Sequence, residues 1–374
     1  MKHILAIIAL LCFILYPSQA AWNHAIEDAD SKLNKMFSVP EAATASFSAT
    51  PLVGGKSYAA SLGAAAFTLS GGAVINGSFP DSVAISPVAN KFALGATFNT
   101  DSLPVEIAVR QVGGFVSLYC DGQLIGTQTV GTSTAIGYYR WTFSTYRHRK
   151  IHAVVSYGAQ FAGVNVSSTA ALTPAPLKYG KKIIAIFGAS TEYGWGADCT
   201  GTGAYWKLAQ ILGINIFLSA QNGTGYITDG STQSYTNRFA NQIAALQAAG
   251  YEVVAVILTN GNGDAVPPAT LSTGVQNLVN TIRTTLPNAI VLGVLPLDIH
   301  GGPMFANQRA GVLAGFQAAN VPFVDPFVPG LLNTQNASTI AWTGGQFTNH
   351  LKQNGYDEYL RFLAPGIVAL LQGL

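Results

Sequence analysis

Two segments far apart in the chain carry side chains that can act as a nucleophile and its base. The apolar run 183–187 leads through Gly188 and Ala189 into Ser190, and His350 lies shortly before a predicted C-terminal helix. A serine hydroxyl is a poor nucleophile until a base takes its proton, so a serine and a histidine held together form the minimum pair for acyl transfer. These residues therefore predict covalent hydrolytic chemistry.

Two polar, glycine-rich loops lie between these segments, and each follows an apolar run. One contains Gly223 and Gly225, and the other contains Asn260 and Asn262. Backbone N–H groups and side-chain amides in such loops can donate hydrogen bonds to a developing oxyanion. Asparagine is also a common turn residue because it tolerates a left-handed backbone. The amides are thus candidates for an oxyanion hole, with simple turn formation as the alternative.

In this order, the four blocks resemble the SGNH (GDSL-like) hydrolase superfamily over residues 181–374. Gly-Ala-Ser stands where the family often has Gly-Asp-Ser, so the resemblance implies Ser190 as the nucleophile. The last block matches best, because His350 is followed by Asn354-Gly355-Tyr356 at the family's spacing. The resemblance therefore implies His350 as the catalytic base.

The resemblance also assigns the oxyanion hole. Its glycine falls on Gly225, with Gly223 as the alternative register. The family's Gly-x-Asn-Asp block corresponds to residues 260–264, so its asparagine falls on Asn262, or on Asn260 if the loop is shifted.

One residue departs from the family pattern. The family usually carries an aspartate three residues before the histidine, and Phe347 stands there in this chain. Such a carboxylate fixes the imidazole tautomer and stabilises the imidazolium. We expect a Ser–His dyad in which a backbone carbonyl or a neutral side chain, such as Gln346 or Thr348, orients His350. Loss of activity is the alternative.

Composition and charge limit the function classes. The 374 residues are 49% hydrophobic and 10% charged, which suits two packed domains, and a net charge of +2 gives no nucleic-acid signal. Lys2 and His3 precede an apolar run over 4–16, and small residues follow at Ser18 and Ala20. This pattern predicts a signal peptide over 1–20, hence a secreted or periplasmic protein with no membrane segment after cleavage. An uncleaved anchor is the alternative.

The pattern of elements predicts two domains after a short N-terminal helical segment, 21–45. Residues 46–169 contain short alternating runs broken by turn residues, with Asp121-Gly122 as a hairpin signal. They predict an antiparallel, jelly-roll-like β-sandwich domain. The proline-containing stretch 170–182 is typical of a linker. The remaining residues, 183–374, predict the hydrolase domain.

From residue 183, apolar strands alternate with helices, which predicts a three-layer α/β/α domain with a parallel sheet. The expected strands are 183–187, 214–218, 253–258, 290–294 and 321–324. The expected helices are 205–212, 238–249, 271–286, 306–319 and 355–371. Ligands bind beyond the carboxyl ends of such strands, where Ser190, Gly225 and Asn262 all fall. Asp298 and His300 follow the fourth strand, as a possible pocket pair or an ordinary polar loop.

These observations favour a serine esterase that removes acetyl groups from a polysaccharide or other glycan, without a cofactor. A polysaccharide O-acetyltransferase is the first alternative, because it shares the acyl-enzyme step. A non-catalytic glycan-binding protein on a decayed hydrolase fold is the second.

Two further features of the sequence bear on binding and redox chemistry. Cys120 and Cys199 fall in different predicted domains, which favours free thiols although secretion permits a disulfide. No Cys/His cluster has metal-ligand spacing. Aromatic and basic residues gather at 138–141 and 146–150, where they predict either sugar stacking or a half-buried strand followed by a solvated turn.

Overall fold

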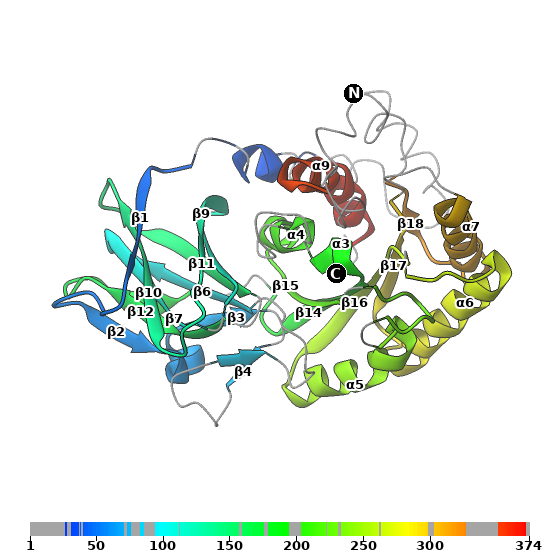
Figure 1. Cartoon of the computed structure of the whole chain (residues 1–374), viewed down its shortest axis with the longest axis horizontal. Coiled ribbons are helices and arrows are strands. Elements are labelled where there is room, and N and C mark those ends of the chain that lie inside the picture. The colour runs from blue at the N-terminus through cyan, green and yellow to red at the C-terminus, as the bar shows by residue number, and fades with distance from the viewer. Residues whose placement is uncertain are drawn as a thin grey trace.

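The structure of the chain is a computed structural model. It describes residues 27, 31–36, 38, 40–70, 73–75, 83–85, 94–111, 113–156, 159–175, 179–193, 203–221, 223–230, 233–261, 263–297, 303–326 and 351–371 (Figure 1). The predicted signal peptide, 1–20, lies outside these ranges.

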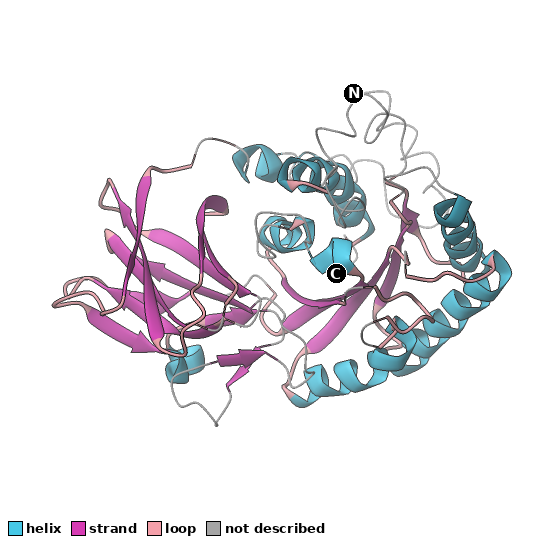
Figure 2. Cartoon of the chain, viewed as in Figure 1, coloured by secondary structure: helices cyan, strands magenta, loops and turns pink. Residues whose placement is uncertain are grey.

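The N-terminal part contains two antiparallel sheets (Figure 2). The first has the order β1-β10-β7-β12-β5-β4, with β2 beside β12, and the second has the order β13-β6-β11-β8-β9, with β3 beside β6. The strands of the first sheet are β1 (Ala43–Ser48), β2 (Lys56–Ala59), β4 (Ala73–Ile75), β5 (Val83–Ile85), β7 (Pro104–Arg110), β10 (Ile136–Phe143) and β12 (Gln160–Val166). Those of the second are β3 (Thr68–Ser70), β6 (Leu94–Thr100), β8 (Phe115–Cys120), β9 (Gln123–Thr129), β11 (Arg149–Ser156) and β13 (Leu172–Pro174), and the short helix η1 (Ala60–Ala65) lies between β2 and β3.

The two sheets bury one common apolar core. Ile107 of β7 and Trp141 of β10 belong to the same buried cluster as Phe98 of β6 and Val116 of β8. Alternate residues of a strand point to opposite faces, so the inward set of each sheet meets the other. The expected antiparallel sheets are confirmed.

The predicted hairpin between β8 and β9 is also confirmed. Asp121 and Gly122 join the two strands with φ values of 51° and 89°. A two-residue turn with positive φ at both positions matches the twist of the flanking strands, which is why Asp-Gly is favoured there.

The strands extend beyond the boundaries expected from the sequence. β1 begins at Ala43, before the predicted start at residue 46. β13 lies inside the segment predicted as the linker, 170–182, and pairs with β6. Pro174 ends β13, and a proline is tolerated there because β13 is an edge strand with one unpaired side. The prolines suggested a linker, but the first part of that segment completes a sheet.

The C-terminal part is a five-stranded sheet with the order β15-β14-β16-β17-β18, and all of its pairings are parallel. Its strands are β14 (Lys182–Gly188), β15 (Asn215–Ala220), β16 (Glu252–Thr259), β17 (Ile290–Val294) and β18 (Phe323–Val324). The helices are α3 (Ser190–Tyr193), α4 (Ala204–Leu212), α5 (Tyr235–Ala248), α6 (Pro268–Thr285), α7 (Pro303–Ala318) and α9 (Gln353–Leu370).

The helices cover both faces of this sheet, so the three-layer arrangement is confirmed (Figure 1). Ile184, Ile186 and Ile216 share one buried cluster with α4 and α9. The alternate residues Ile183, Ala185 and Phe187 share the other with α5, α6 and α7. Each strand is buried on both faces, which explains its continuous apolar sequence.

The antiparallel and parallel parts meet through an apolar contact beside α4. Tyr119 of β8 and Val154 of β11 belong to the same buried cluster as Trp206 of α4. The ring of His152 lies 6.4 Å from that of Trp206, and burial lowers the pKa of His152 to about 3. The histidine is therefore a neutral packing residue at neutral pH.

Candidate active site

The strand order places two loops side by side at the carboxyl edge of the parallel sheet. The chain passes from β14 to β15 on one side and then to β16 on the other, so the connections after β14 and β16 diverge. Ligands of open α/β sheets bind at such a switch point. Ser190 is the first residue of α3, two residues beyond the end of β14, and Asn260 directly follows β16.

A buried carboxylate lies behind the turn that carries Ser190. Glu192 is 2% exposed, and its Oε2 accepts a hydrogen bond of 2.8 Å from the N–H of Ala189. A Cβ added to Gly188 would lie 2.4 Å from Cγ of Glu192, so this position requires glycine. Burial raises the pKa of Glu192, and hydrogen bonds to its carboxylate oppose that rise.

The loop after β16 is bonded to the same carboxylate. Asn260 is buried, and its Nδ2 lies 3.4 Å from each carboxylate oxygen of Glu192. Its backbone N–H donates to the carbonyl of Val294 at 3.1 Å, and its φ is 62°, a left-handed conformation that favours glycine or asparagine. Glu192 therefore bridges the first and third loops of the predicted site.

The second loop is fixed to the third by another buried carboxylate. Asp264 accepts hydrogen bonds from the N–H groups of Tyr226 (2.6 Å), Ile227 (3.1 Å) and Thr228 (2.8 Å). A Cβ on Gly225 would lie 2.2 Å from this carboxylate, so Gly225 is needed for the two loops to pack together. Burial raises the pKa of Asp264, and the three N–H groups oppose that rise.

The two candidate glycines of the oxyanion hole differ in their backbone hydrogen bonds. The N–H of Gly225 donates to the carbonyl of Thr228 at 3.0 Å, so it is already engaged. Gly223 has a φ of 70°, and no acceptor for its N–H occurs among the described residues. The geometry thus favours the alternative register, Gly223, as an amide donor.

A buried arginine ties the ends of β14 and β15 together. The guanidinium of Arg238 donates to the carbonyls of Gly188 (2.8 Å), Ser219 (2.9 Å) and Gln233 (2.5 Å), and to the hydroxyl of Thr224 (3.1 Å). Burial lowers its pKa to about 10, so it is a cation at neutral pH. Within the described part of the chain it forms no ion pair with a carboxylate, and neutral oxygens hold its charge.

Sequence reasoning missed Glu192 and Arg238. Glu192 could have been noticed from the sequence, because it lies two residues after the predicted nucleophile and the chain has only 17 acidic residues. Arg238 had no comparable signal, because an arginine at the start of a helix is ordinarily solvated.

Several predicted site residues lie outside the described residues: His350, Asn262, Asp298, His300 and Phe347. Leu351, which follows His350, is buried in the same cluster as Ile186 of β14 and Leu218 of β15. Asp325, the acid that directly follows β18, forms an ion pair with Arg309 of α7.

The aromatic and basic residues of the sandwich are mostly structural. Tyr139 and Trp141 are buried in its core, so a role for these two rings in sugar stacking is wrong. Arg140 pairs with the buried Glu106 at 2.6 Å. Tyr146 is exposed, but its hydroxyl donates to Asp101 at 2.9 Å.

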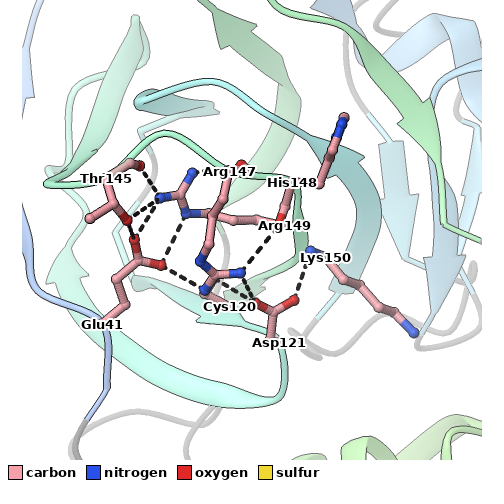
Figure 3. Close-up of polar contacts among 8 residues, drawn as sticks. All are labelled: Glu41, Cys120, Asp121, Thr145, Arg147, His148, Arg149 and Lys150. Carbon is pink, nitrogen blue, oxygen red and sulfur yellow. Dashed lines mark hydrogen bonds and ion pairs between the residues drawn. The ribbon is translucent and has the colours of Figure 1, made fainter.

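The arginines of the turn 146–150 form ion pairs with acidic side chains. The guanidinium groups of Arg147 and Arg149 converge on Glu41, whereas the side chains of His148 and Lys150 point away (Figure 3). Arg147 also pairs with Asp121 at 2.6 Å.

Three further observations concern metals, membranes and thiols. Within the described ranges, no three His, Cys, Asp or Glu side chains are grouped so as to hold a metal ion. None of the described helices combines the length and the apolar character needed to cross a bilayer. Cys120 is a buried free thiol, and burial raises its pKa to about 12; Cys199 lies outside the described residues.

No family model and no curated protein matches this sequence. Solved structures share the fold across most of the chain, at low sequence identity. A family two carbohydrate esterase from Clostridium thermocellum, in complex with cellohexaose, has a TM-score of 0.60 at 14% identity, covering 80% of this chain and 98% of the other. The salicylyl-acyltransferase SsfX3 from a tetracycline biosynthetic pathway has a TM-score of 0.61 at 14% identity, covering 83% and 97%.

An acetyl xylan esterase, Est2A, from the rumen bacterium Butyrivibrio proteoclasticus has a TM-score of 0.53 at 12% identity, covering 74% of this chain and 89% of the other. A putative GDSL-like lipase from Bacteroides ovatus has a TM-score of 0.53 at 16% identity, covering 75% of this chain and 85% of the other. The chain is thus similar in structure to carbohydrate esterases of family two and to a GDSL-like lipase.

Proposed function

We propose that this chain is a secreted serine esterase that removes acyl groups, acetyl foremost, from a polysaccharide or other glycan. The observation that carries the proposal is the position of Ser190, at the first turn after strand β14 and beside the diverging loop of β16. Structural similarity to an acetyl xylan esterase and to an esterase bound to cellohexaose supports the acyl group and the glycan.

In the proposed reaction, His350 takes the proton of Ser190 as Oγ bonds to the ester carbonyl carbon. The two side chains then approach to about 2.6–3.2 Å. His350 returns that proton to the sugar oxygen as the ester bond breaks, leaving an acyl-serine. A water molecule, deprotonated by His350, attacks the acyl carbon and releases the carboxylic acid and free Ser190.

We assign the oxyanion hole to the N–H groups of Ser190 and Gly223 and to the side chain of Asn262. Gly223 replaces Gly225 in this proposal, because the N–H of Gly225 donates to Thr228. Asn262 is preferred to Asn260 for two reasons. The left-handed Asn260 stands where the motif has its glycine, and its Nδ2 is directed at Glu192.

The test is hydrolysis of 4-nitrophenyl acetate and release of acetate from acetylated xylan by the mature protein. We expect turnover of both substrates. An inactive wild-type protein would refute the esterase proposal and favour a non-catalytic glycan-binding protein.

A second candidate function is O-acyl transfer, favoured by the shared fold with a salicylyl-acyltransferase. Here a sugar hydroxyl would replace water in the second step. Incubation of the protein with 4-nitrophenyl acetate and a cello-oligosaccharide separates the two. Free acetate as the product indicates a hydrolase, and an acetylated oligosaccharide indicates a transferase.

A further inference from the structure

We propose that Glu192 is a positioning residue that, as an ionised carboxylate, holds the nucleophile turn and the Asn260 loop in one catalytic arrangement. This inference rests on the proposed esterase function. The inference adds to the site a residue that the Ser–His motif does not contain. It is drawn from the contacts of Glu192 with the nucleophile turn on one side and with Asn260 on the other.

Glu192 contacts the backbone beside the nucleophile on one side. The N–H of Ala189 donates to its Oε2 at 2.8 Å, which fixes the Gly188–Ala189 peptide, one peptide before the one that carries the N–H of Ser190. Because Gly188 has no side chain, the carboxylate packs directly under the turn. The orientation of the Ser190 N–H, which we assign to the oxyanion hole, therefore depends on Glu192.

On the other side Glu192 holds Asn260. Both carboxylate oxygens lie 3.4 Å from Nδ2, whereas Oδ1 of Asn260 is buried and has no hydrogen-bond partner among the described residues. A carboxylate accepts hydrogen bonds, so it keeps the NH₂ end of the amide toward itself. A protonated Glu192 would instead favour the opposite amide orientation, with Oδ1 as its acceptor. The charge of Glu192 thus selects one orientation of Asn260.

The groups around Glu192 do not neutralise it. Burial, and after it the charge of Glu192, raises the pKa of Tyr235 of α5 and of Tyr356 and Tyr359 of α9. Burial likewise raises the pKa of Tyr205 of α4 and Tyr226 of the second loop, where the charge of Glu192 is a smaller influence. Within the described residues no cation forms an ion pair with this carboxylate. The buried cation Arg238 of α5 donates to the carbonyl of Gly188, which precedes this turn, and has no hydrogen bond to the carboxylate.

A buried acid of this kind weakens the fold when it is ionised. Burial raises the pKa of Glu192, so between its unfolded and folded pKa values the folded chain binds more protons than the unfolded chain. Stability therefore falls as the pH rises through that window. A neutral glutamine would avoid this loss, so stability alone does not account for glutamate here. Retention of a destabilising charge beside a nucleophile is the pattern of a stability–activity trade-off.

The test is Glu192→Gln, which keeps the size of the side chain and removes its charge. We expect kcat for 4-nitrophenyl acetate to fall by about 10–100-fold with little change in KM, because the site loses a preorganised arrangement of groups that stabilises the transition state. The melting temperature at pH 8 should be equal to or above that of the wild type, and the difference should shrink toward pH 4. Glu358→Gln, on the exposed face of α9, is the matched control and should change neither quantity.

A paired substitution distinguishes positioning from simple packing. In Glu192→Gln/Asn260→Asp the amide and the carboxylate exchange places. The introduced amide can then donate through Nε2 to the introduced carboxylate, while its Oε1 accepts from the N–H of Ala189. Aspartate tolerates the left-handed backbone at this position. We expect the double variant to recover part of the lost kcat, which a double-mutant cycle would report as coupling between the two positions.

Two results would overturn the inference. One is a Glu192→Gln variant with wild-type kcat. The other is a variant that melts earlier at pH 8, loses kcat only in proportion to its unfolded fraction and is not rescued by Asn260→Asp. Either result leaves the esterase proposal intact, whereas an inactive wild-type protein refutes that proposal first.

Discussion

Buried charges are handled in opposite ways in the sandwich and at the carboxyl edge of the parallel sheet. In the sandwich they are paired. The fully buried Arg149 meets Glu41 at 2.5 Å (Figure 3). The fully buried Glu106 meets Arg140 at 2.6 Å. The hydrogen bond from Arg149 is the largest influence that lowers the pKa of Glu41 to about 2. These pairs favour the charged forms and support the fold.

At the carboxyl edge of the parallel sheet, buried charges are held by neutral groups. Glu192, Asp264 and Arg238 are each buried, and in the described part of the chain none forms an ion pair. Burial shifts each pKa toward the neutral form. Such charges cost stability unless they are fully hydrogen-bonded. We infer that the sandwich uses charge to hold strands together, whereas the sheet edge uses it to fix the loops of the proposed catalytic site.

The largest expected effect at the sheet edge is that of Ser190→Ala. We expect ester turnover to fall by about 10⁴–10⁶-fold, because no other group can form the acyl intermediate. The melting temperature should stay within about 2 °C of wild type, since the loss of one half-buried hydroxyl at the start of a short helix costs little stability. Ser46→Ala, on the exposed strand β1, is the control. Near-normal turnover in Ser190→Ala would show that the nucleophile is misassigned.

The third loop should show a graded effect. Removal of one preorganised oxyanion donor typically lowers turnover by ~10²–10³-fold, which we expect for Asn262→Ala. Asn260→Ala should lower kcat by only about 10-fold. The amide of Asn260 is directed at Glu192, so it helps to position the loop and does not bind the oxyanion itself. Steady-state kinetics on 4-nitrophenyl acetate measures both. The reverse ranking would mean that the register of this loop is shifted by two residues.

Substitutions in the ion pair between Glu41 and Arg149 of the sandwich should lower stability without lowering kcat, the reverse of the effects expected at the sheet edge. Glu41→Gln should lower the free energy of unfolding by about 2–4 kcal/mol, because it leaves the buried Arg149 without its carboxylate. Asp121→Asn is the control. It removes a more exposed pair with Arg147 and should cost under about 1 kcal/mol.

The pH dependence of this effect has a definite sign. The folded pKa of Glu41 is lowered from its usual 4.5 to about 2. Its contribution is therefore full above pH 4.5 and is lost as the pH falls through that window. Urea unfolding should show a smaller difference in the free energy of unfolding between wild type and Glu41→Gln at pH 3 than at pH 7. A constant gap would contradict the assigned pairing.

The smallest expected effect concerns Phe347. A dyad oriented by a neutral group stabilises the imidazolium less than a triad does, so Phe347→Asp should raise kcat/KM by a few-fold or leave it unchanged. The comparison is with Asp325→Asn and Asp298→Asn. If one of these substitutions cripples turnover while the fold is retained, a displaced triad replaces the dyad.

The sequence predicted the features that depend on periodicity. The alternation of apolar runs with amphipathic segments after residue 182 identified the parallel sheet, and the alternating short strands with Asp121-Gly122 identified the antiparallel part. It also placed Ser190 and Gly225, together with the loop that carries Asn262, at the carboxyl edge, because parallel strands bring their ends together.

Features set by tertiary contacts could not be predicted in this way. The rule that charged residues lie on the surface gave no indication that Glu192 and Arg238 are fully buried beneath the loops. Pro174 suggested a linker, because proline is rare in strands, yet an edge strand tolerates it. The hydrogen bond from Gly225 to Thr228 likewise appears only when the loop is folded, and it changes which glycine is the better amide donor.

The central claim, that Ser190 is an activated nucleophile, is tested most directly by covalent labelling. The mature protein is treated with diisopropyl fluorophosphate, and the adduct is located by peptide mass spectrometry. We predict one adduct per chain, on Ser190, and none in Ser190→Ala. An unlabelled wild-type protein, or an adduct on another residue that persists in Ser190→Ala, would contradict the account.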